Sequence, residues 1–180
     1  DLQQLQHFNL GYLENILEGK YRPGHFQGVC NVVYRLLNVV KPDTIFLGSK
    51  DYQQYLVLKT MMQQFFPDIN INLVDILREE NGLAMSSRNT RLNNDARKKA
   101  TAIYHALQYI KQNIEENSFE DLTQHAKEII LNNGFDKIDY IEICDAETLL
   151  PADNFNADKK LIVLTAAFIN NVRLIDNIVL

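Results

Sequence analysis

Two short polar segments carry the residue types that could do chemistry in this chain. The first is Gly48-Ser49-Lys50-Asp51, which directly follows an apolar run. The second is Met85-Ser86-Ser87-Arg88-Asn89, which lies in a polar stretch after another apolar run. Lysine and arginine neutralise phosphate oxygens, and hydroxyl groups and the N–H groups of a helix start donate hydrogen bonds to them. We therefore expect a nucleotide-handling site in an α/β protein.

The first segment has a functional and a structural interpretation. Lys50 could contact phosphate oxygens, and Asp51 could bind ribose hydroxyls or a magnesium-bound water. Gln54, one helical turn further on, could hydrogen-bond a small polar substrate. In the alternative, Asp51 only caps a helix and Lys50 is solvated.

The second segment has the same ambiguity. Ser86, Ser87 and Arg88 resemble a mobile phosphate clamp, in which Gly82 and Ala84 would let the loop move. In the alternative, the stretch is an ordinary polar linker. Because both segments come just after a predicted strand, their joint occurrence favours the functional interpretation.

A third candidate is Arg22-Pro23-Gly24-His25. Proline and glycine shape a turn before a helix, and Arg22 and His25 could face the same crevice. The alternative is a helix entry with His25 near its start. We find no metal-ligand spacing, no Walker A motif and no G-x-S-x-G motif.

The elements around the first segment form a βαβ pattern. Apolar spacing predicts a helix over residues 26–40, ended by Lys41-Pro42, and a strand over 44–47. A helix over 52–66 and a strand over 69–76 follow. Two strands joined by a helix are expected to be parallel, and ligands of such sheets bind beyond the carboxyl ends of the strands. Gly48 lies at such an end and is expected to permit a tight turn.

The remainder of the chain has helices and then strands. One amphipathic helix is predicted over residues 100–114, and a capping box of Ser118 and Asp121 begins another that Asn133-Gly134 ends. Strands are predicted over 138–144, 161–168 and 172–180, with a hairpin turn at Asn170-Asn171. We therefore predict a partial Rossmann-like domain over 1–89, and a small α+β domain with a three-stranded antiparallel sheet over 90–180.

Composition limits the classes of protein. The chain has 180 residues, of which 46% are hydrophobic, and a net charge of −5. This charge argues against a nucleic-acid-binding surface. No apolar run approaches the ~20 residues that span a bilayer, and no signal-peptide pattern is present, so we expect a cytoplasmic protein without membrane contact. Cys30 and Cys144 lie in apolar segments and are interpreted as reduced core cysteines.

Four stretches of the chain resemble the pantothenate synthetase (pantoate–β-alanine ligase) family. Residues 17–29 resemble its L-E-G-x-x-R-P-x-H-F-x-G-V, and residues 46–54 resemble its F-G-E-K-D-[FY]-Q-Q. Residues 81–89 resemble D-G-L-A-M-S-S-R-N, and residues 166–177 resemble A-A-x-x-x-x-x-R-L-I-D-N. The similarity extends from about Leu17 to the last strand.

The resemblance implies an enzyme that joins pantoate to β-alanine with ATP, through a pantoyl-adenylate, and releases AMP and pyrophosphate. It also implies a class I nucleotidyltransferase-like fold, a homodimer, and magnesium bound with ATP. The residues that it assigns to ATP are Gly48, Ser49, Lys50, Asp51, Leu77, Met85, Ser86, Ser87 and Arg88. It assigns Gln54 and Arg22 to pantoate, and catalysis to Lys50, Ser86, Ser87 and Arg88.

Two departures from the family pattern modify this expectation. Ser49 replaces the usual glutamate, with a small expected effect, and the family's M-G-x-L-H-x-G-H segment is absent. One βαβ unit is also too little to bury both faces of a parallel sheet. We therefore expect this chain to be the C-terminal part of the ligase and inactive alone. The alternatives are another nucleotidyltransferase of the same superfamily, or a non-catalytic module that folds and dimerises.

Overall fold

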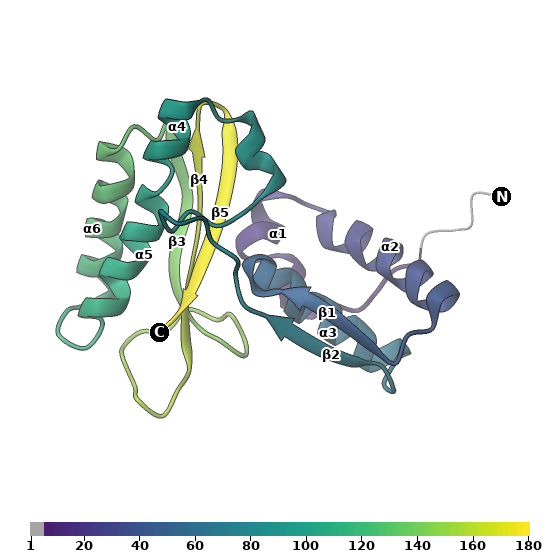
Figure 1. Ribbon diagram of the computed structural model, residues 1–180. Helices are drawn as coiled ribbons and strands as arrows, with labels where there is room; N and C mark the ends of the chain where they lie inside the picture. The colour runs from purple at the N-terminus through teal and green to yellow at the C-terminus, as the bar shows by residue number, and fades with distance from the viewer. Residues whose placement is uncertain (1–5) are drawn as a thin grey trace. The chain divides into compact units, whose positions relative to one another are not determined.

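A computed structural model describes residues 6–180, which form two compact units. The first unit ends at Asp75, and the second unit runs from Ile76 to Leu180. Each unit has its own sheet (Figure 1). Residues 1–5 of the predicted first domain lie outside the described part of the chain.

The first unit is built around a parallel strand pair. Its elements are η1 (Gly11–Glu14), α1 (Leu17–Tyr21), α2 (His25–Val40), β1 (Thr44–Gly48), η2 (Ser49–Asp51), α3 (Tyr52–Phe65) and β2 (Asn70–Val74). β1 pairs with β2 in parallel, from Thr44 opposite Asn70 to Gly48 opposite Val74. The predicted βαβ unit is therefore confirmed. α2 ends where it was predicted to end, with Lys41 in the left-handed conformation (φ 48°) before Pro42.

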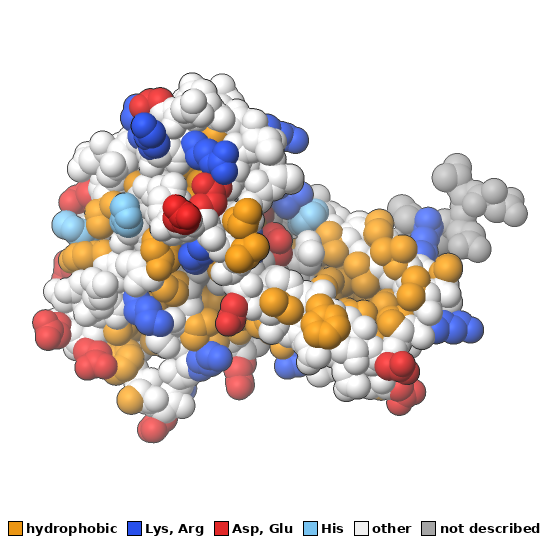
Figure 2. Space-filling model, viewed as in Figure 1, with side chains coloured by type: hydrophobic (Ala, Val, Ile, Leu, Met, Phe, Trp, Pro, Cys, Tyr) orange, Lys and Arg blue, Asp and Glu red, His pale blue; other side chains and the backbone are white. Residues whose placement is uncertain are grey.

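Part of the apolar surface of the first unit is exposed. α3 buries Leu56, Val57 and Met61, but Phe46 on β1 is 68% exposed and Val39 on α2 is 82% exposed. Figure 2 shows many hydrophobic side chains on the visible face of this unit. The unit therefore covers the α3 side of its core more completely than the outer face of α2.

The second unit has two helices packed on a three-stranded sheet (Figure 1). Its elements are η3 (Ser87–Arg91), α4 (Asn94–Lys99), α5 (Ala102–Asn113), α6 (Phe119–Asn132), β3 (Lys137–Asp145), β4 (Leu161–Ile169) and β5 (Val172–Val179). The strands form the predicted three-stranded antiparallel sheet, and their order is β3-β4-β5. The core takes apolar side chains from both helices and all three strands, including Ile103, Leu107, Ile110, Leu122, Ile130, Ile143, Val163 and Leu174.

The predicted caps and turns of the second unit are confirmed. The Ser118 hydroxyl accepts a hydrogen bond from the Asp121 N–H at 3.1 Å and caps α6. Asn170 and Asn171 both have positive φ (49° and 60°), which is the geometry of a tight hairpin turn between β4 and β5. Gly134 follows α6 with a φ of +84°.

One predicted helix boundary differs from the structure. The helix predicted over 100–114 begins at Ala102, and a separate helix α4 precedes it, capped by the Asn93 side chain, which accepts from the Ala96 N–H at 2.8 Å. Residues 76–89 belong to the second compact unit, and the predicted domain division at residues 89 and 90 stays a prediction. Long-range bonding joins this stretch to the second unit, because Arg78 pairs with Asp176 on β5.

Both cysteines are free and buried, as expected. Burial, with a smaller contribution from Glu14, raises the pKa of the Cys30 thiol to about 12. Burial, with the nearby carboxylates of Glu142 and Asp145, does the same for Cys144. Among residues 6–180 we find no helix that is long and apolar enough to cross a membrane.

Candidate functional site

The first predicted segment lies at the carboxyl end of β1. The strand ends at Gly48, and Ser49–Asp51 form the short turn η2, which leads directly into α3. The predicted turn follows Gly48, which itself has an ordinary extended conformation (φ −73°, ψ 132°), so the turn does not depend on a positive φ at this glycine. A Cβ at this position would meet no protein atom within 4 Å, so the strand end is open at this glycine.

Lys50, Asp51 and Gln54 are at least partly accessible at this strand end. Lys50 and Gln54 are half-buried, and Asp51 is exposed. Asp51 stands at the N-cap position of α3, but its side chain makes no capping hydrogen bond. The structural alternative, in which the Asp51 carboxylate caps the helix, is therefore wrong for this conformation.

Gln53 is a residue that the sequence interpretation missed. It is 3% exposed, and its amide oxygen accepts a hydrogen bond from the Glu18 N–H at 2.9 Å. Its amide nitrogen donates to the carbonyls of Leu13 (2.8 Å) and Ile16 (2.9 Å). Adjacent positions of a helix point about 100° apart, so Gln53 and Gln54 have separate roles. The paired glutamines in the sequence were the signal for this division.

Gln53 also attaches the segment of Arg22 to α3. Arg22 follows α1, and its guanidinium lies 3.7 Å from the Glu18 carboxylate, whose backbone N–H is bonded to Gln53. The structure therefore ties the segments of Arg22 and Gln54 together. His25 is the first residue of α2 and follows Gly24 (φ +76°). This is the helix entry that the alternative interpretation of Arg22–His25 predicted.

The second predicted segment begins as a tight hairpin rather than a loose linker. The Glu79 N–H donates to the Leu83 carbonyl at 2.8 Å, and the Met85 N–H donates to the Leu77 carbonyl at 2.9 Å. These bonds bring Leu77 and Met85 together. Their side chains are 71% and 50% exposed, so two apolar side chains flank this end of the hairpin.

Ser86, Ser87 and Arg88 follow the hairpin and form the start of η3. The Ser86 hydroxyl accepts from the Arg88 N–H at 3.2 Å and caps η3, whereas Ser87 is exposed. The Arg88 guanidinium donates through Nη1 to the Arg173 carbonyl on β5 at 3.0 Å. A guanidinium has five N–H donors, and this hydrogen bond uses one of them. The bond therefore orients the Arg88 guanidinium and leaves further N–H groups for a ligand.

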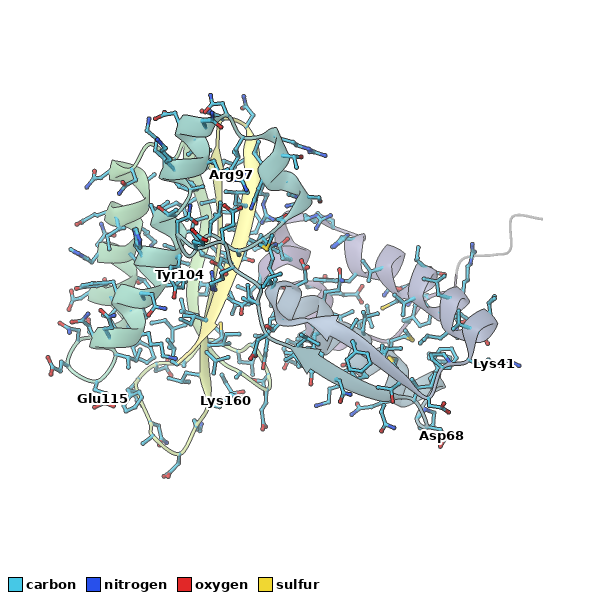
Figure 3. All side chains as sticks on the ribbon, in the orientation of Figure 1. Lys41, Asp68, Arg97, Tyr104, Glu115 and Lys160 are labelled. Carbon is cyan, nitrogen blue, oxygen red and sulfur yellow. The ribbon has the colours of Figure 1, made fainter. Side chains whose placement is uncertain are left out.

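Gly82 and Ala84 have a packing role in the hairpin. Gly82 has a φ of +89°, and a Cβ there would collide with the ring of Tyr104, which Figure 3 labels on α5. Ala84 is 4% exposed. The small size of both residues therefore lets the hairpin pack closely, and their expected role in loop movement stays a prediction.

A polar network of Asn89, Glu79 and Arg97 supports the segment that contains Ser86, Ser87 and Arg88. Asn89 is buried, and its amide nitrogen donates to the Ala84 carbonyl at 3.0 Å and to the Glu79 carboxylate at 3.2 Å. Arg97, labelled in Figure 3, donates to both oxygens of Glu79 at 2.8 and 3.1 Å. The hydrogen bond from Arg97 is the main reason that the pKa of Glu79 lies below its ordinary value.

The predicted site residues therefore fall into two organised groups. Gly48, Ser49, Lys50, Asp51, Gln54 and Arg22 belong to the first unit, and Leu77, Met85, Ser86, Ser87 and Arg88 belong to the second. Their convergence on one nucleotide stays a prediction. Within residues 6–180 there is no group of three His, Cys, Asp or Glu side chains arranged to hold a metal ion.

Comparison with known proteins shows which family the chain resembles. A family model described as pantoate-beta-alanine ligase matches residues 4–179. Pantothenate synthetase of Caldicellulosiruptor saccharolyticus is 44% identical over 169 residues, which are 93% of this chain and 59% of that protein. Its counterpart in Shewanella sp. (strain ANA-3) is 42% identical over 178 residues, which are 98% of this chain and 62% of that protein.

Solved structures agree with the sequence matches. The crystal structure of pantothenate synthetase from Thermus thermophilus superposes with a TM-score of 0.87 at 37% identity, covering 93% of this chain and 60% of that one. Pantoate-beta-alanine ligase from Francisella tularensis, complexed with beta-gamma ATP and beta-alanine, gives a TM-score of 0.73 at 34% identity, covering 97% and 58%. The chain thus spans about 60% of the length of these relatives. It belongs to the pantoate–β-alanine ligase family.

Proposed function

We propose that this chain contributes to the ATP and pantoate sites of an enzyme that condenses pantoate with β-alanine to give pantothenate, AMP and pyrophosphate. Membership of the ligase family supports this proposal. So does the Francisella relative, which was crystallised with an ATP compound and β-alanine. The observation that carries it is local: Lys50 and Asp51 lie at the carboxyl end of a parallel strand, where a helix begins, and Asp51 is not used as a cap.

The reaction needs charge stabilisation more than a protein nucleophile. In the first step a pantoate carboxylate oxygen attacks the α-phosphorus of ATP, and the bond to pyrophosphate breaks. In the second step the amine of β-alanine attacks the acyl carbon of the adenylate, AMP leaves, and the amine loses a proton. Positioning and preorganised donors can supply the rate of both steps. Neither cysteine is suited to act as a nucleophile, because both are buried with a raised pKa.

Each group of residues has a role in this proposal. Lys50 and Arg88 stabilise the triphosphate and the departing pyrophosphate, and Ser86 and Ser87 donate hydroxyl hydrogen bonds to the same oxygens. Asp51 binds the ribose or a water of the magnesium ion that accompanies ATP, and the backbone of Leu77 meets the adenine. Gly48 leaves the strand end open, while Ser49 and Met85 flank the nucleotide. Gln54 and Arg22 bind pantoate.

The finer properties are also proposals. We propose that the enzyme is a cytoplasmic homodimer whose partners are the three small-molecule substrates, with no nucleic-acid or membrane partner. The family's M-G-x-L-H-x-G-H segment does not occur in these 180 residues. We therefore propose that a polypeptide of these residues alone binds ATP but does not turn over at a normal rate.

A binding experiment with a matched lysine control tests the proposal. Calorimetry should show that ATP with magnesium binds the chain, that Lys50→Ala weakens this binding, and that Lys59→Ala, an exposed lysine further along α3, does not. Equal affinities for the three proteins would remove Lys50 from the site.

A second experiment tests the chemistry. In an enzyme completed with the H-x-G-H segment of a relative, Lys50→Ala should slow pyrophosphate release by at least ~10²-fold, as loss of a preorganised donor does elsewhere. Products of pantoate, β-alanine and ATP are then identified by mass spectrometry. Transfer of the nucleotide to a phosphorylated acceptor instead would identify a different nucleotidyltransferase. No turnover and no ATP binding would identify a non-catalytic module.

A further inference from the structure

We propose that Asp176 is a positioning residue for the nucleotide: through its ion pair with Arg78 it holds residues 85–88 in their binding conformation. This inference rests on the proposed function for the identity of the ligand, ATP. It also gives a role to the R-L-I-D-N stretch, residues 173–177, whose sequence match alone assigns it none.

Arg78 and Asp176 form a largely buried, bidentate ion pair. The Arg78 guanidinium donates from Nη1 to Asp176 Oδ2 at 2.7 Å and from Nη2 to Oδ1 at 3.0 Å. The Asp176 side chain is 4% exposed and that of Arg78 is 18% exposed. Bidentate pairs of this kind fix orientation as well as distance.

The same guanidinium reaches the hairpin and α5. Nη1 also donates to the Gly82 carbonyl at 3.0 Å, and Nη2 donates to the Asn177 carbonyl at 3.2 Å. Its central carbon lies 4.4 Å from the centre of the Tyr104 ring. Arg78 thus connects the tip of the hairpin, strand β5 and helix α5 through one planar group.

The hairpin leads directly into the proposed phosphate-binding residues. Arg78 forms a β-bridge with Ala84, and the Met85 N–H donates to the Leu77 carbonyl. Met85, which directly precedes Ser86, is therefore held by the strand of the hairpin that contains Arg78, and Asp176 holds Arg78. On the far side, Arg88 donates to the Arg173 carbonyl. Both ends of the Ser86-Ser87 pair are therefore attached to β5.

The energetics of buried ion pairs favour a positioning role for Arg78 and Asp176. Such a pair adds little net stability, because desolvation of the two charges offsets their attraction, and apolar replacements of similar volume are often as stable. Apolar side chains cannot make the hydrogen bonds that the Arg78 guanidinium donates simultaneously to Asp176, Gly82 and Asn177. The pair should therefore affect the order of the loop more than the stability of the unit.

Two aspartates of the second unit provide a matched comparison. Asp139 is also buried, at 3% exposed, and also accepts from an arginine, Arg173 Nε, at 2.8 Å. Asp139 also pairs with Lys137, which lies on β3 and not on the hairpin. We expect Asp176→Asn, but not Asp139→Asn, to speed amide hydrogen exchange at residues 85–88 in the nucleotide-free chain by at least about tenfold, which corresponds to about 1.4 kcal/mol. ATP affinity should fall by a similar factor in Asp176→Asn alone.

A double variant separates positioning from stability. Arg78→Met with Asp176→Leu replaces the ion pair by apolar side chains, and we expect it to recover the melting temperature of the wild type while residues 85–88 still exchange rapidly. Slow exchange in this double variant, or equal exchange in the two single aspartate variants, would overturn the inference. Because exchange is measured without ATP, failure of the wild type to bind ATP would count against the proposed function and leave the exchange result decisive for the inference.

Discussion

Gly82→Ala should destabilise the second unit, because two costs fall on one methyl group. Gly82 has a φ of +89°, a region that costs an L-residue about 1–2 kcal/mol. The new Cβ would also collide with Tyr104 Cδ1 and would lie 2.5 Å from Tyr104 Cε1. Carbon atoms pack at about 3.5–4.0 Å, so the ring must withdraw by more than ~1 Å.

The ring is not free to withdraw at no cost. The central carbon of the Arg78 guanidinium lies 4.4 Å from the centre of the ring. The Tyr104 hydroxyl accepts a hydrogen bond from the Gln108 amide nitrogen at 2.7 Å. Overpacking of this kind costs about 1–3 kcal/mol, so the total for Gly82→Ala is about 2–5 kcal/mol. Gly134→Ala is the matched control, because its φ is +84° but its nearest neighbour, Lys99 Cδ, would be 3.5 Å away. That variant should lose only about 1–2 kcal/mol.

The assay must report the second unit alone. Native-state hydrogen exchange of amides in β4 and β5, measured in increasing urea, gives the unfolding free energy of that unit. Gly82→Ala should exceed Gly134→Ala by about 1–3 kcal/mol, and adding Tyr104→Ala should remove much of the excess. Equal losses in the two glycine variants would refute the contact argument.

Three further predictions follow from buried or paired side chains. Gln53→Leu should destabilise the first unit by about 1–3 kcal/mol, because it removes the partners of three backbone groups. Cys30 and Cys144, with pKa values raised to about 12, should resist a thiol reagent at pH 8 until the chain is unfolded. Arg97 lowers the pKa of Glu79 from 4.5. The ionised Glu79 should therefore stabilise the fold above pH 4.5 and lose this effect as the pH falls through its folded pKa. The melting temperatures of wild type and Glu79→Gln should then converge in acid.

Each of these predictions has a control and a contradicting result. Gln63→Leu, an exposed glutamine on the same helix, should leave the unfolding free energy nearly unchanged, and an equal loss there would contradict the role of Gln53. Labelling of either cysteine in the native chain would contradict its burial. Glu80→Gln changes an exposed neighbouring carboxylate, and a pH response equal to that of Glu79→Gln would show that the ion pair with Arg97 is not the cause.

Local patterns in the sequence predicted most of the fold. Ser118 and the Asn170-Asn171 pair act through their own backbone neighbourhood, so their positions could be predicted without knowledge of the rest of the chain. The break before Ala102 was missed because Asn93 starts a short helix that apolar spacing does not mark. Which of two adjacent glutamines turns inward also could not be known, because Gln53 is buried by partners 35 to 40 residues away.

The residue types of the candidate site were predicted from the sequence, but their supporting contacts were not. Lys50, Asp51 and Ser86–Arg88 are predicted site residues because cations and hydroxyls after strands indicate a phosphate site. The bonding of Arg78 and Arg88 to β5 was not predicted, since no local pattern links these residues to Asp176 and Arg173. The convergence of Lys50 and Arg88 stays a prediction that nucleotide binding can test.

The pairing of Arg78 with Asp176 has a consequence for biosynthesis. The two residues are 98 positions apart, so a ribosome must add β5 long after the hairpin has emerged. Closing so large a span has an entropic cost that local turns avoid. We expect the hairpin to gain protection in pulse-labelled refolding only when β5 joins β4, and earlier protection would show that it orders itself. A nascent chain would thus complete this part of its proposed ligand site only after β5 has been synthesised.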